Sequence, residues 1–190
     1  MVLEVGEQTV LLHDPQGYPY ATLPIPDFVG SWRAERVAYM DEPFVQRTGF
    51  VRERDIDTSE ALRTVPARAI AWLAGRTDRS MPPGTVHGSE AVHSLAEQVG
   101  RGLDGEVREM LVEFTVRVGA RRLIDAASCL HLLGLHEASK IADEQARIVG
   151  ALQHPMVGGE DDAVIAGLRR LAPTYDRLRI ALQETEQQPD

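Results

Sequence analysis

The spacing of apolar residues separates a β-like beginning from a longer helical remainder. Within residues 7–24, two short apolar or aromatic runs flank the sequence DPQG at 14–17. Asp at the first turn position, Pro at the second and Gly at the fourth match a type I turn, which commonly closes hairpin loops of four or five residues. We therefore predict a β-hairpin, with Tyr18 and Tyr20 on one face of its second strand.

Residues between the hairpin and position 57 fit two interpretations. The prolines of PIPDF end the second strand, because proline cannot donate a ladder hydrogen bond. Asp27 could then cap a helix over 28–40, in which Phe28 and Trp32 would lie one turn apart. The segments RVAYM and GFVRERD alternate well enough to extend the sheet instead. We favour the helix for 28–40.

From Asp57 onward the pattern is helical. The sequence DTSE at 57–60 has the spacing of a capping box. Thr64 is placed to cap a second helix over 65–75, and the inward positions of that helix would be Ala69, Trp72 and Leu73. The sequence RTDRSMPPGTVHG at 76–88 is rich in proline, glycine and small polar residues, which predicts a linker loop.

Four apolar stripes at helical spacing follow the linker, and a second loop is predicted at HPMVGGEDD, residues 154–162. Leu133-Gly134-Leu135 predicts a helix stop, because glycine accepts the left-handed backbone and the next apolar residue folds back onto the helix. Pro173 is expected to bend or divide the last helix. The stripes consist of Val92, Leu95, Ala96 and Val99; Val107, Met110, Leu111, Phe114 and Val118; Ala138, Ile141, Ala142, Ala146 and Val149; and Val164, Ile165, Leu168, Leu171, Tyr175, Leu178 and Leu182.

Helices with single apolar stripes and short connections predict a mainly α fold. We expect an antiparallel bundle of about five or six helices, with an N-terminal β-hairpin or small antiparallel sheet. The corresponding domains are residues 1–57 as a hairpin or mixed segment and residues 58–187 as the bundle, with 76–88 as a linker loop.

Charge and composition narrow the classes of partner. The formal charge of −9 disfavours nucleic acid and anionic lipid. No run of about 18 apolar residues exists, so we expect no membrane segment, and the first twenty residues do not have the pattern of a signal peptide. The lone Cys129 suits a reducing compartment and a cytoplasmic location. Arginine supplies all basic residues except Lys140, a skew that indicates a GC-rich genome and a bacterial-like composition.

His131 and His136 are the first candidates for metal chemistry. In an unbroken helix their five-residue separation would set them about 140° apart around the axis, whereas a chelating pair needs four residues of separation. With a break at Gly134 the rings lie on different helices, and we expect the break to scatter them. This stretch is therefore interpreted as a joint between helices.

Glu90 and His93 form a Glu-x-x-His pair, which di-iron carboxylate bundles use twice. The chain has the motif once, although Glu109 and Glu113 could add carboxylates. We expect the protein to have no cofactor. The alternative is a divalent metal ion, with ligands from Glu90, His93, Glu109, Glu113, His131 and His136.

Two groups of arginines and several aromatic residues are candidates for recognition. Arg117, Arg121 and Arg122 form one group, and a second lies at 169–179. Either could bind an anionic ligand or an acidic partner, although a solvated surface of mixed charge explains them equally. Large aromatic side chains serve as interface or core anchors, and the candidates are Trp32, Trp72, Tyr18 and Tyr20.

These patterns favour a non-catalytic helical module for protein interaction or assembly, self-associating as a homo-oligomer. The sequence has neither a phosphate-binding glycine loop nor a Gly-x-Ser-x-Gly motif, and we assign no catalytic residue. A metal-dependent enzyme or sensor is the first alternative. A nucleic-acid-binding regulator is the second, since 126–142 has a helix-turn-helix outline, but Lys140 stands where an apolar residue is expected and acidic residues would face the phosphates.

Overall fold

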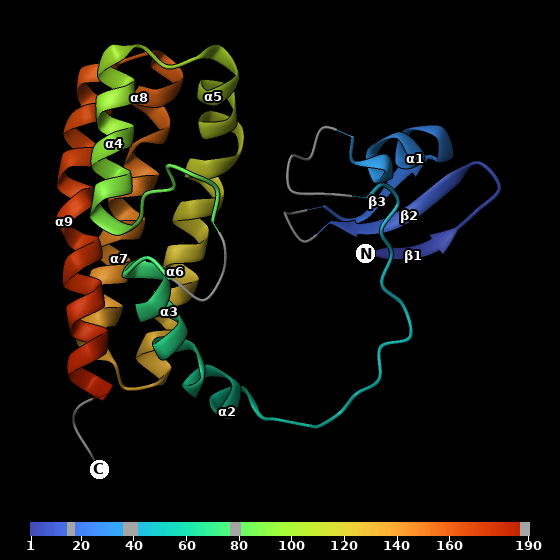
Figure 1. Cartoon of the computed structure of the whole chain (residues 1–190), viewed down its shortest axis with the longest axis horizontal. Helices are drawn as coiled ribbons and strands as arrows, with labels where there is room; N and C mark the ends of the chain where they lie inside the picture. Colours follow the sequence, from blue (N-terminus) through green and yellow to red (C-terminus); the bar gives the residue numbers. More distant parts are fainter. Residues whose placement is uncertain (15–17, 36–41, 77–80, 187–190) are drawn as a thin grey trace. The chain divides into compact units, whose positions relative to one another are not determined.

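The computed structural model describes residues 1–14, 18–35, 42–76 and 81–186 (Figure 1). The chain divides into two compact units, Met1–Asp55 and Ile56–Asp190. It is mainly α, with a helical bundle in the second unit and a small antiparallel sheet at the N-terminus, as the sequence predicts. No helix among the described residues has the length and apolar character needed to cross a membrane.

The sheet consists of β1 (Val2–Val5), β2 (Thr9–Asp14) and β3 (Tyr18–Pro24), paired antiparallel in that order. The pairing of β2 with β3 confirms the predicted hairpin, whose turn at 15–17 lies outside the described residues. β1 is an addition that the sequence pattern did not reveal. The central strand β2 carries Val10, which is fully buried.

A β-bulge falls within the stretch of β3 on which the sequence predicts Tyr18 and Tyr20 to share one face. Asp14 pairs with Tyr18 and Leu12 pairs with Ala21, so β3 has one residue more than β2 over this stretch. Tyr20 takes the extra position with a left-handed φ of 59° and is exposed. The bulge interrupts the two-residue alternation on which the prediction depended.

Helix α1 (Ile25–Arg33) begins directly after β3 and ends earlier than predicted. Proline in its first turn presets φ, and Asp27 lies inside that turn rather than at the cap, so the predicted cap is wrong. Phe28 and Trp32 do lie one turn apart, with ring centroids separated by 5.8 Å. RVAYM lies outside the described residues, whereas GFVRERD forms no strand.

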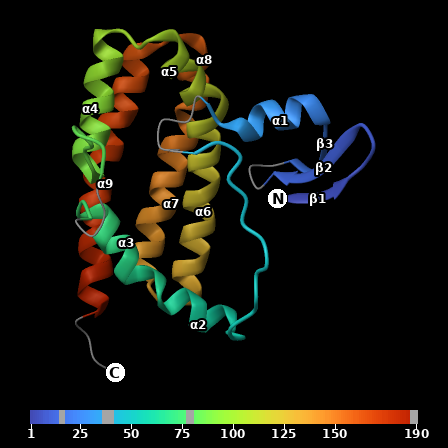
Figure 2. The same cartoon turned by 45° about the vertical axis from the view of Figure 1, so that its right-hand side comes forward.

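The bundle unit contains four long helices that run side by side (Figures 1 and 2). α7 packs on both α6 and α9, and α9 also packs on α4 and α3. Along the chain the described elements are α2 (Thr58–Arg63), α3 (Val65–Leu73), α4 (Gly88–Arg101), α5 (Gly105–Met110), the π-helical turn η1 (Leu111–Thr115), α6 (Val116–Leu132), α7 (His136–Ala151), α8 (Gln153–Gly158) and α9 (Asp161–Glu186).

The buried side chains confirm the apolar stripes predicted for α4, α7 and α9. α9 continues across Pro173 as one helix. The prediction of a loop at 154–162 is largely wrong, because α8 forms there and buries Met156 in the core. In the predicted linker, residues 77–80 lie outside the described residues.

The first helices of this unit show one correct cap and two errors. The Asp57 carboxylate accepts a hydrogen bond from the Glu60 amide at 2.7 Å, as the capping box predicts. The Thr64 hydroxyl instead donates to the Ala61 carbonyl at 2.8 Å, so Thr64 does not cap α3 through its side chain. Trp72, predicted to point inward, is half exposed, and Ile70 packs against the core in its place.

The strongest predicted stripe is wrong in part: Leu111 is buried and Val107 packs against the core, but the π-helical turn η1 changes which of the following residues face inward. α5, η1 and α6 form one continuous helix from Gly105 to Leu132. A π turn holds one residue more than an α turn, so Leu111 and Val116, five residues apart, are both buried. Met110 and Phe114 are consequently 54% and 42% exposed. The helix thus presents to solvent two large side chains that the spacing had placed in the core.

Candidate functional site

The joint between α6 and α7 is a tightly bonded reversal at Gly134, whose φ is 77°. The Leu135 amide donates to the Leu130 carbonyl at 2.9 Å, and the Gly134 amide donates to the His131 carbonyl at 3.0 Å. This pair of bonds is the Schellman motif that terminates helices at a left-handed glycine. The predicted helix stop is confirmed.

The reversal brings His131 and His136 together, and the expectation that it would scatter them is wrong. Their ring centroids are 5.0 Å apart, with an angle of 56° between the ring planes. Both residues are exposed. Because the connection is short, the last turn of α6 lies beside the first turn of α7, and the imidazoles of these two turns meet across the joint.

The other proposed metal ligands do not join this pair. Glu90 and His93 lie on α4, Glu109 lies on α5 and Glu113 lies in η1, and all four residues are exposed. Across the described ranges no group of three or more histidine, cysteine, aspartate or glutamate side chains is arranged to hold a metal ion. The structure therefore assembles two of the six proposed ligands.

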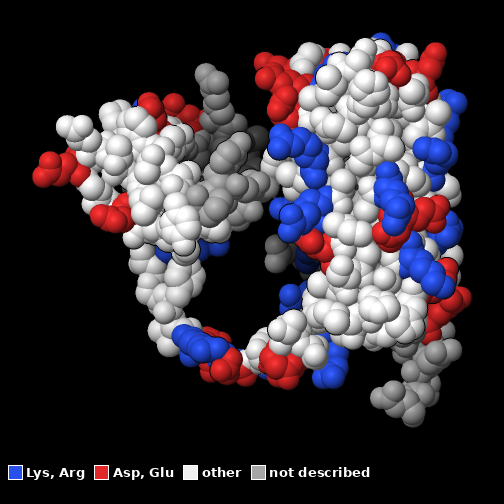
Figure 3. All heavy atoms as spheres, turned by 180° about the vertical axis from the view of Figure 1, so that it is seen from behind, with Lys and Arg blue, Asp and Glu red and all other residues white. Residues whose placement is uncertain are grey.

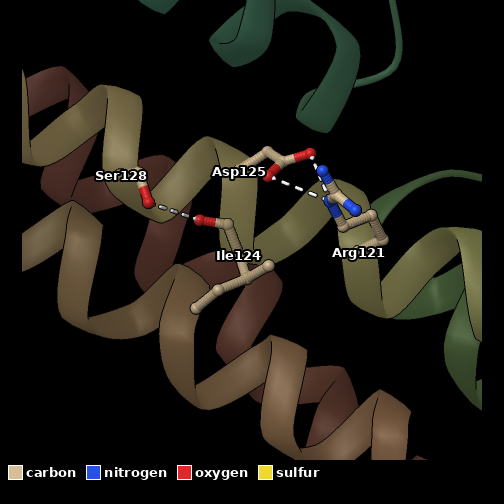
Figure 4. A network of polar contacts seen from close by, with 4 residues as sticks. All are labelled: Arg121, Ile124, Asp125 and Ser128. Atoms are coloured by element: carbon tan, nitrogen blue, oxygen red, sulfur yellow. Dashed lines mark hydrogen bonds and ion pairs between the residues drawn. The ribbon is translucent and has the colours of Figure 1, made fainter.

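The first arginine group lies along α6 on a surface of mixed charge. Arg117, Arg121 and Arg122 are exposed. The Arg121 guanidinium donates to both carboxylate oxygens of Asp125, at 3.0 and 3.2 Å, and one turn further on the Ser128 hydroxyl donates to the Ile124 carbonyl at 3.0 Å (Figure 4). Exposed pairs of this kind contribute little to stability, so these charges remain available to a partner.

Two members of the second arginine group, Arg170 and Arg177, line a shallow groove of about 530 Å³ between α7 and α9, together with Arg147 of α7. Arg147 is 2.8 Å from Asp143, and Arg177 is 2.9 Å from Glu144 on the neighbouring helix. The hydrogen bond and the negative charge of Asp143 raise the pKa of the Arg147 guanidinium. Acidic and basic atoms are accordingly interspersed on the bundle surface (Figure 3). The lining residues are Asp143, Glu144, Arg147, Ile148, Arg170, Pro173, Thr174 and Arg177.

Gln145 is a buried polar residue that the sequence interpretation missed. Its side chain is fully buried, and its Nε2 donates to the Thr174 hydroxyl at 3.0 Å, which in turn donates to the Leu171 carbonyl. Within the described residues the Gln145 Oε1 atom has no hydrogen-bond partner. Its spacing of four from Ile141 and from Val149 is the signal that could have placed it on the inward face.

The aromatic candidates are divided between the two units. In the first unit the Trp32 indole donates to the Val45 carbonyl at 3.0 Å and packs edge-on against Phe44 at 5.5 Å. In the second unit the guanidinium carbon of Arg76 lies 4.6 Å from the centroid of the Trp72 ring, a cation–π contact. Trp32 is thus a packing anchor of its own unit, while Trp72 remains at the surface.

The outer side of the continuous helix from Gly105 to Leu132 carries exposed apolar side chains, which we call the outer face. These are Met110, Phe114 and Leu132, of which Leu132 is 74% exposed. Among the described elements, α6 makes extensive backbone contact only with α7 and with η1, which precedes it. The other elements of the bundle unit therefore leave much of the circumference of α6 uncovered.

Comparison with protein families matches residues 82–183 to the model described as the YobF C-terminal domain. The matched residues all lie in the second unit and extend from just before α4 to near the end of α9. Neither the curated proteins nor the solved structures contain a match to the chain.

Proposed function

We propose that the helical bundle, through whose residues 82–183 the chain belongs to the YobF C-terminal domain family, is a non-catalytic module for protein interaction that associates with a second copy of itself. The outer face is the contact surface. A reducing compartment such as the cytoplasm suits the single Cys129, which cannot form an internal disulfide.

The observation that carries this proposal is the exposure of Met110 and Phe114 by the π turn. Turning these two side chains outward places apolar area in water, at a cost of roughly 25 cal/mol for each Å² exposed. A partner surface that covers them recovers this free energy. Methionine and aromatic side chains are also among the residues enriched at the centres of protein interfaces.

The charges on the outer face suit a symmetric pair. In a two-fold contact each surface meets its own copy, so a patch must be complementary to itself. Arg121 and Asp125 lie one turn apart with opposite sign, at a separation of 3.0 Å. Two such helices packed in parallel about a two-fold axis along their length can exchange these partners, with Arg121 of each copy facing Asp125 of the other.

Light scattering coupled to size-exclusion chromatography, in buffer containing EDTA, tests the proposal. The full chain is expected to show a mass that rises with concentration toward that of two copies. Phe114→Glu and Met110→Glu should each weaken association by roughly 30-fold, the effect of losing an interface anchor worth about 2 kcal/mol.

Ile180→Glu is the matched control, because Ile180 is an exposed apolar residue on α9, a helix that makes no extensive contact with α5, η1 or α6. It should leave the association constant unchanged. A mass of one chain at every concentration would overturn the proposal, as would association that neither outer-face substitution weakens.

A further inference from the structure

We propose that His131 and His136 chelate a divalent transition-metal ion, with Zn²⁺ as the reference ion, and that a second copy of the chain supplies the remaining two ligands. This inference deepens the proposed function, since it rests on the same self-association and names a bridge at one end of the helix concerned. It differs from the bundle-core metal centre considered from the sequence, because it uses two exposed side chains and no carboxylate.

The separation of the two rings fits a shared ion. A histidine nitrogen lies about 2.0–2.1 Å from zinc, which puts the ring centre about 3.2 Å from the ion. Two such rings at a tetrahedral angle then have centres about 5.2 Å apart. The observed separation of 5.0 Å matches this value, and the 56° angle between the planes avoids ring stacking.

The backbone of both histidines is held before any ion binds. The His131 carbonyl accepts from the Gly134 amide at 3.0 Å, and the His136 amide donates to the Gly134 carbonyl at 2.9 Å. The Ser139 hydroxyl, in the next turn of α7, donates to the Ala127 carbonyl of α6 at 2.8 Å. Binding therefore restricts only the side-chain rotamers, which lowers the entropy lost on chelation.

The charges around the joint tolerate a cation. His131 lies in the last turn of α6, where the free carbonyl groups favour positive charge. His136 lies in the first turn of α7, which disfavours it, but Glu137 adds a carboxylate in the same turn. Lys140 lies 3.7 Å from the Glu137 carboxylate and neutralises part of this charge.

The number of ligands points to a second copy. Zinc in a closed site takes four ligands, and the described part of the chain offers two, with no third histidine, cysteine or carboxylate in reach. A two-fold axis through the ion supplies the same two imidazoles again, which completes four nitrogen ligands. Leu132, beside His131 and 74% exposed, would then be covered by the partner.

The experiment uses the full chain without a histidine tag, stripped of metal with a chelator that is then removed. Titration calorimetry with Zn²⁺ should give one ion for every two chains, and light scattering should show a mass of two chains on adding zinc at a concentration where the metal-free chain is monomeric. Replacement of Zn²⁺ by Co²⁺ should produce the intense visible bands of tetrahedral coordination.

His131→Asn and His136→Asn should each weaken zinc binding by roughly 100-fold, because the second contact of a linked pair adds at least that factor. Both should abolish the cobalt bands and the zinc-dependent dimer. His154→Asn is the matched control, since His154 is an exposed histidine on α8 and should leave all three readouts unchanged. Circular dichroism confirms that each variant is folded, which is expected because both rings are exposed.

Three results would overturn the inference: no zinc binding, one ion for each chain, or a dimer that the histidine substitutions do not affect. The proposed function is tested separately in EDTA with Phe114→Glu. If the chain associates in EDTA but does not bind zinc, the proposed function stands and the zinc bridge is wrong. If the chain is monomeric in EDTA and pairs only with zinc, the zinc bridge stands and the outer-face contact is wrong.

Discussion

At the scale of single residues, Gln145 shows a conflict between packing and polarity. It occupies an inward position of α7 between Ile141 and Val149, and its Nε2 atom donates to the Thr174 hydroxyl of α9. Its Oε1 atom is buried and finds no partner among the described residues. A buried acceptor without a hydrogen bond costs about 1–3 kcal/mol. Gln145 therefore joins α7 to α9 through its Nε2 atom and destabilises the same contact through its Oε1 atom.

Substitutions on the two sides of this hydrogen bond should therefore have unequal effects. Thr174→Val should lower the free energy of unfolding by about 1–3 kcal/mol, because it leaves the Gln145 amide without its acceptor. Gln145→Met fills the same space without a buried polar atom and should change stability by less than about 1 kcal/mol. Urea unfolding of both variants and of the double variant measures the coupling.

The double variant should be more stable than Thr174→Val alone, since no polar group is then orphaned. A loss on Gln145→Met larger than that on Thr174→Val would contradict this account and would indicate that Oε1 makes a bond of its own.

Local chemistry could be predicted at this scale only where a residue has one available partner. The Asp57 carboxylate has the Glu60 amide within reach, and the capping box forms. The Thr64 hydroxyl has a competing acceptor one turn back, the Ala61 carbonyl, and donates there. A threonine can do either in isolation, so sequence spacing could not decide.

At the scale of elements, the π turn η1 sets which face of α6 reaches the core. The spacing of Val107, Leu111 and Phe114 fits an ordinary α-helix well. The structure instead buries Leu111 with Val116, and the Gln153 side chain of α8 donates to the Val112 carbonyl within the turn. These contacts come from distant parts of the chain, so a periodicity along one segment could not anticipate the extra residue.

Removal of one residue from the π turn should convert it to an ordinary α turn. Deletion of Glu113, an exposed residue, leaves Leu111 and Val116 four apart and still on one face. We expect the deletion variant to fold. Its free energy of unfolding should differ from that of the parent chain by less than about 1 kcal/mol, because the π turn stores little strain. Thermal unfolding followed by circular dichroism provides the measurement.

Deletion of Asp125, also exposed, is the matched control within regular α-helix. It rotates everything after it by about 100° and should destabilise the bundle by several kcal/mol, because the buried Ala127 leaves its contact with α7. Equal destabilisation by the two deletions would show that η1 is not a one-residue insertion.

At the scale of the whole molecule, the class of fold followed from periodicity, whereas the candidate site did not. Apolar stripes and the stop at Gly134 were enough to predict antiparallel helices and the joint between α6 and α7. The approach of His131 to His136 depends on how the two helices pack across that joint. Helical spacing describes each helix alone, so it contains no information on distances between side chains of successive helices.

The shortness of the α6–α7 connection also has a kinetic consequence. These two helices form the most extensive contact in the described bundle, and residues 133–135 alone separate them. Closing so small a loop loses little chain entropy, whereas the contact of α4 with α9 must join the two ends of the bundle. We expect refolding to start at the α6–α7 hairpin, with high φ-values for Ala127→Gly and Ala138→Gly and low ones for Val92→Ala. The chain would then condense outward from its middle, and α4 would be the last long helix to dock.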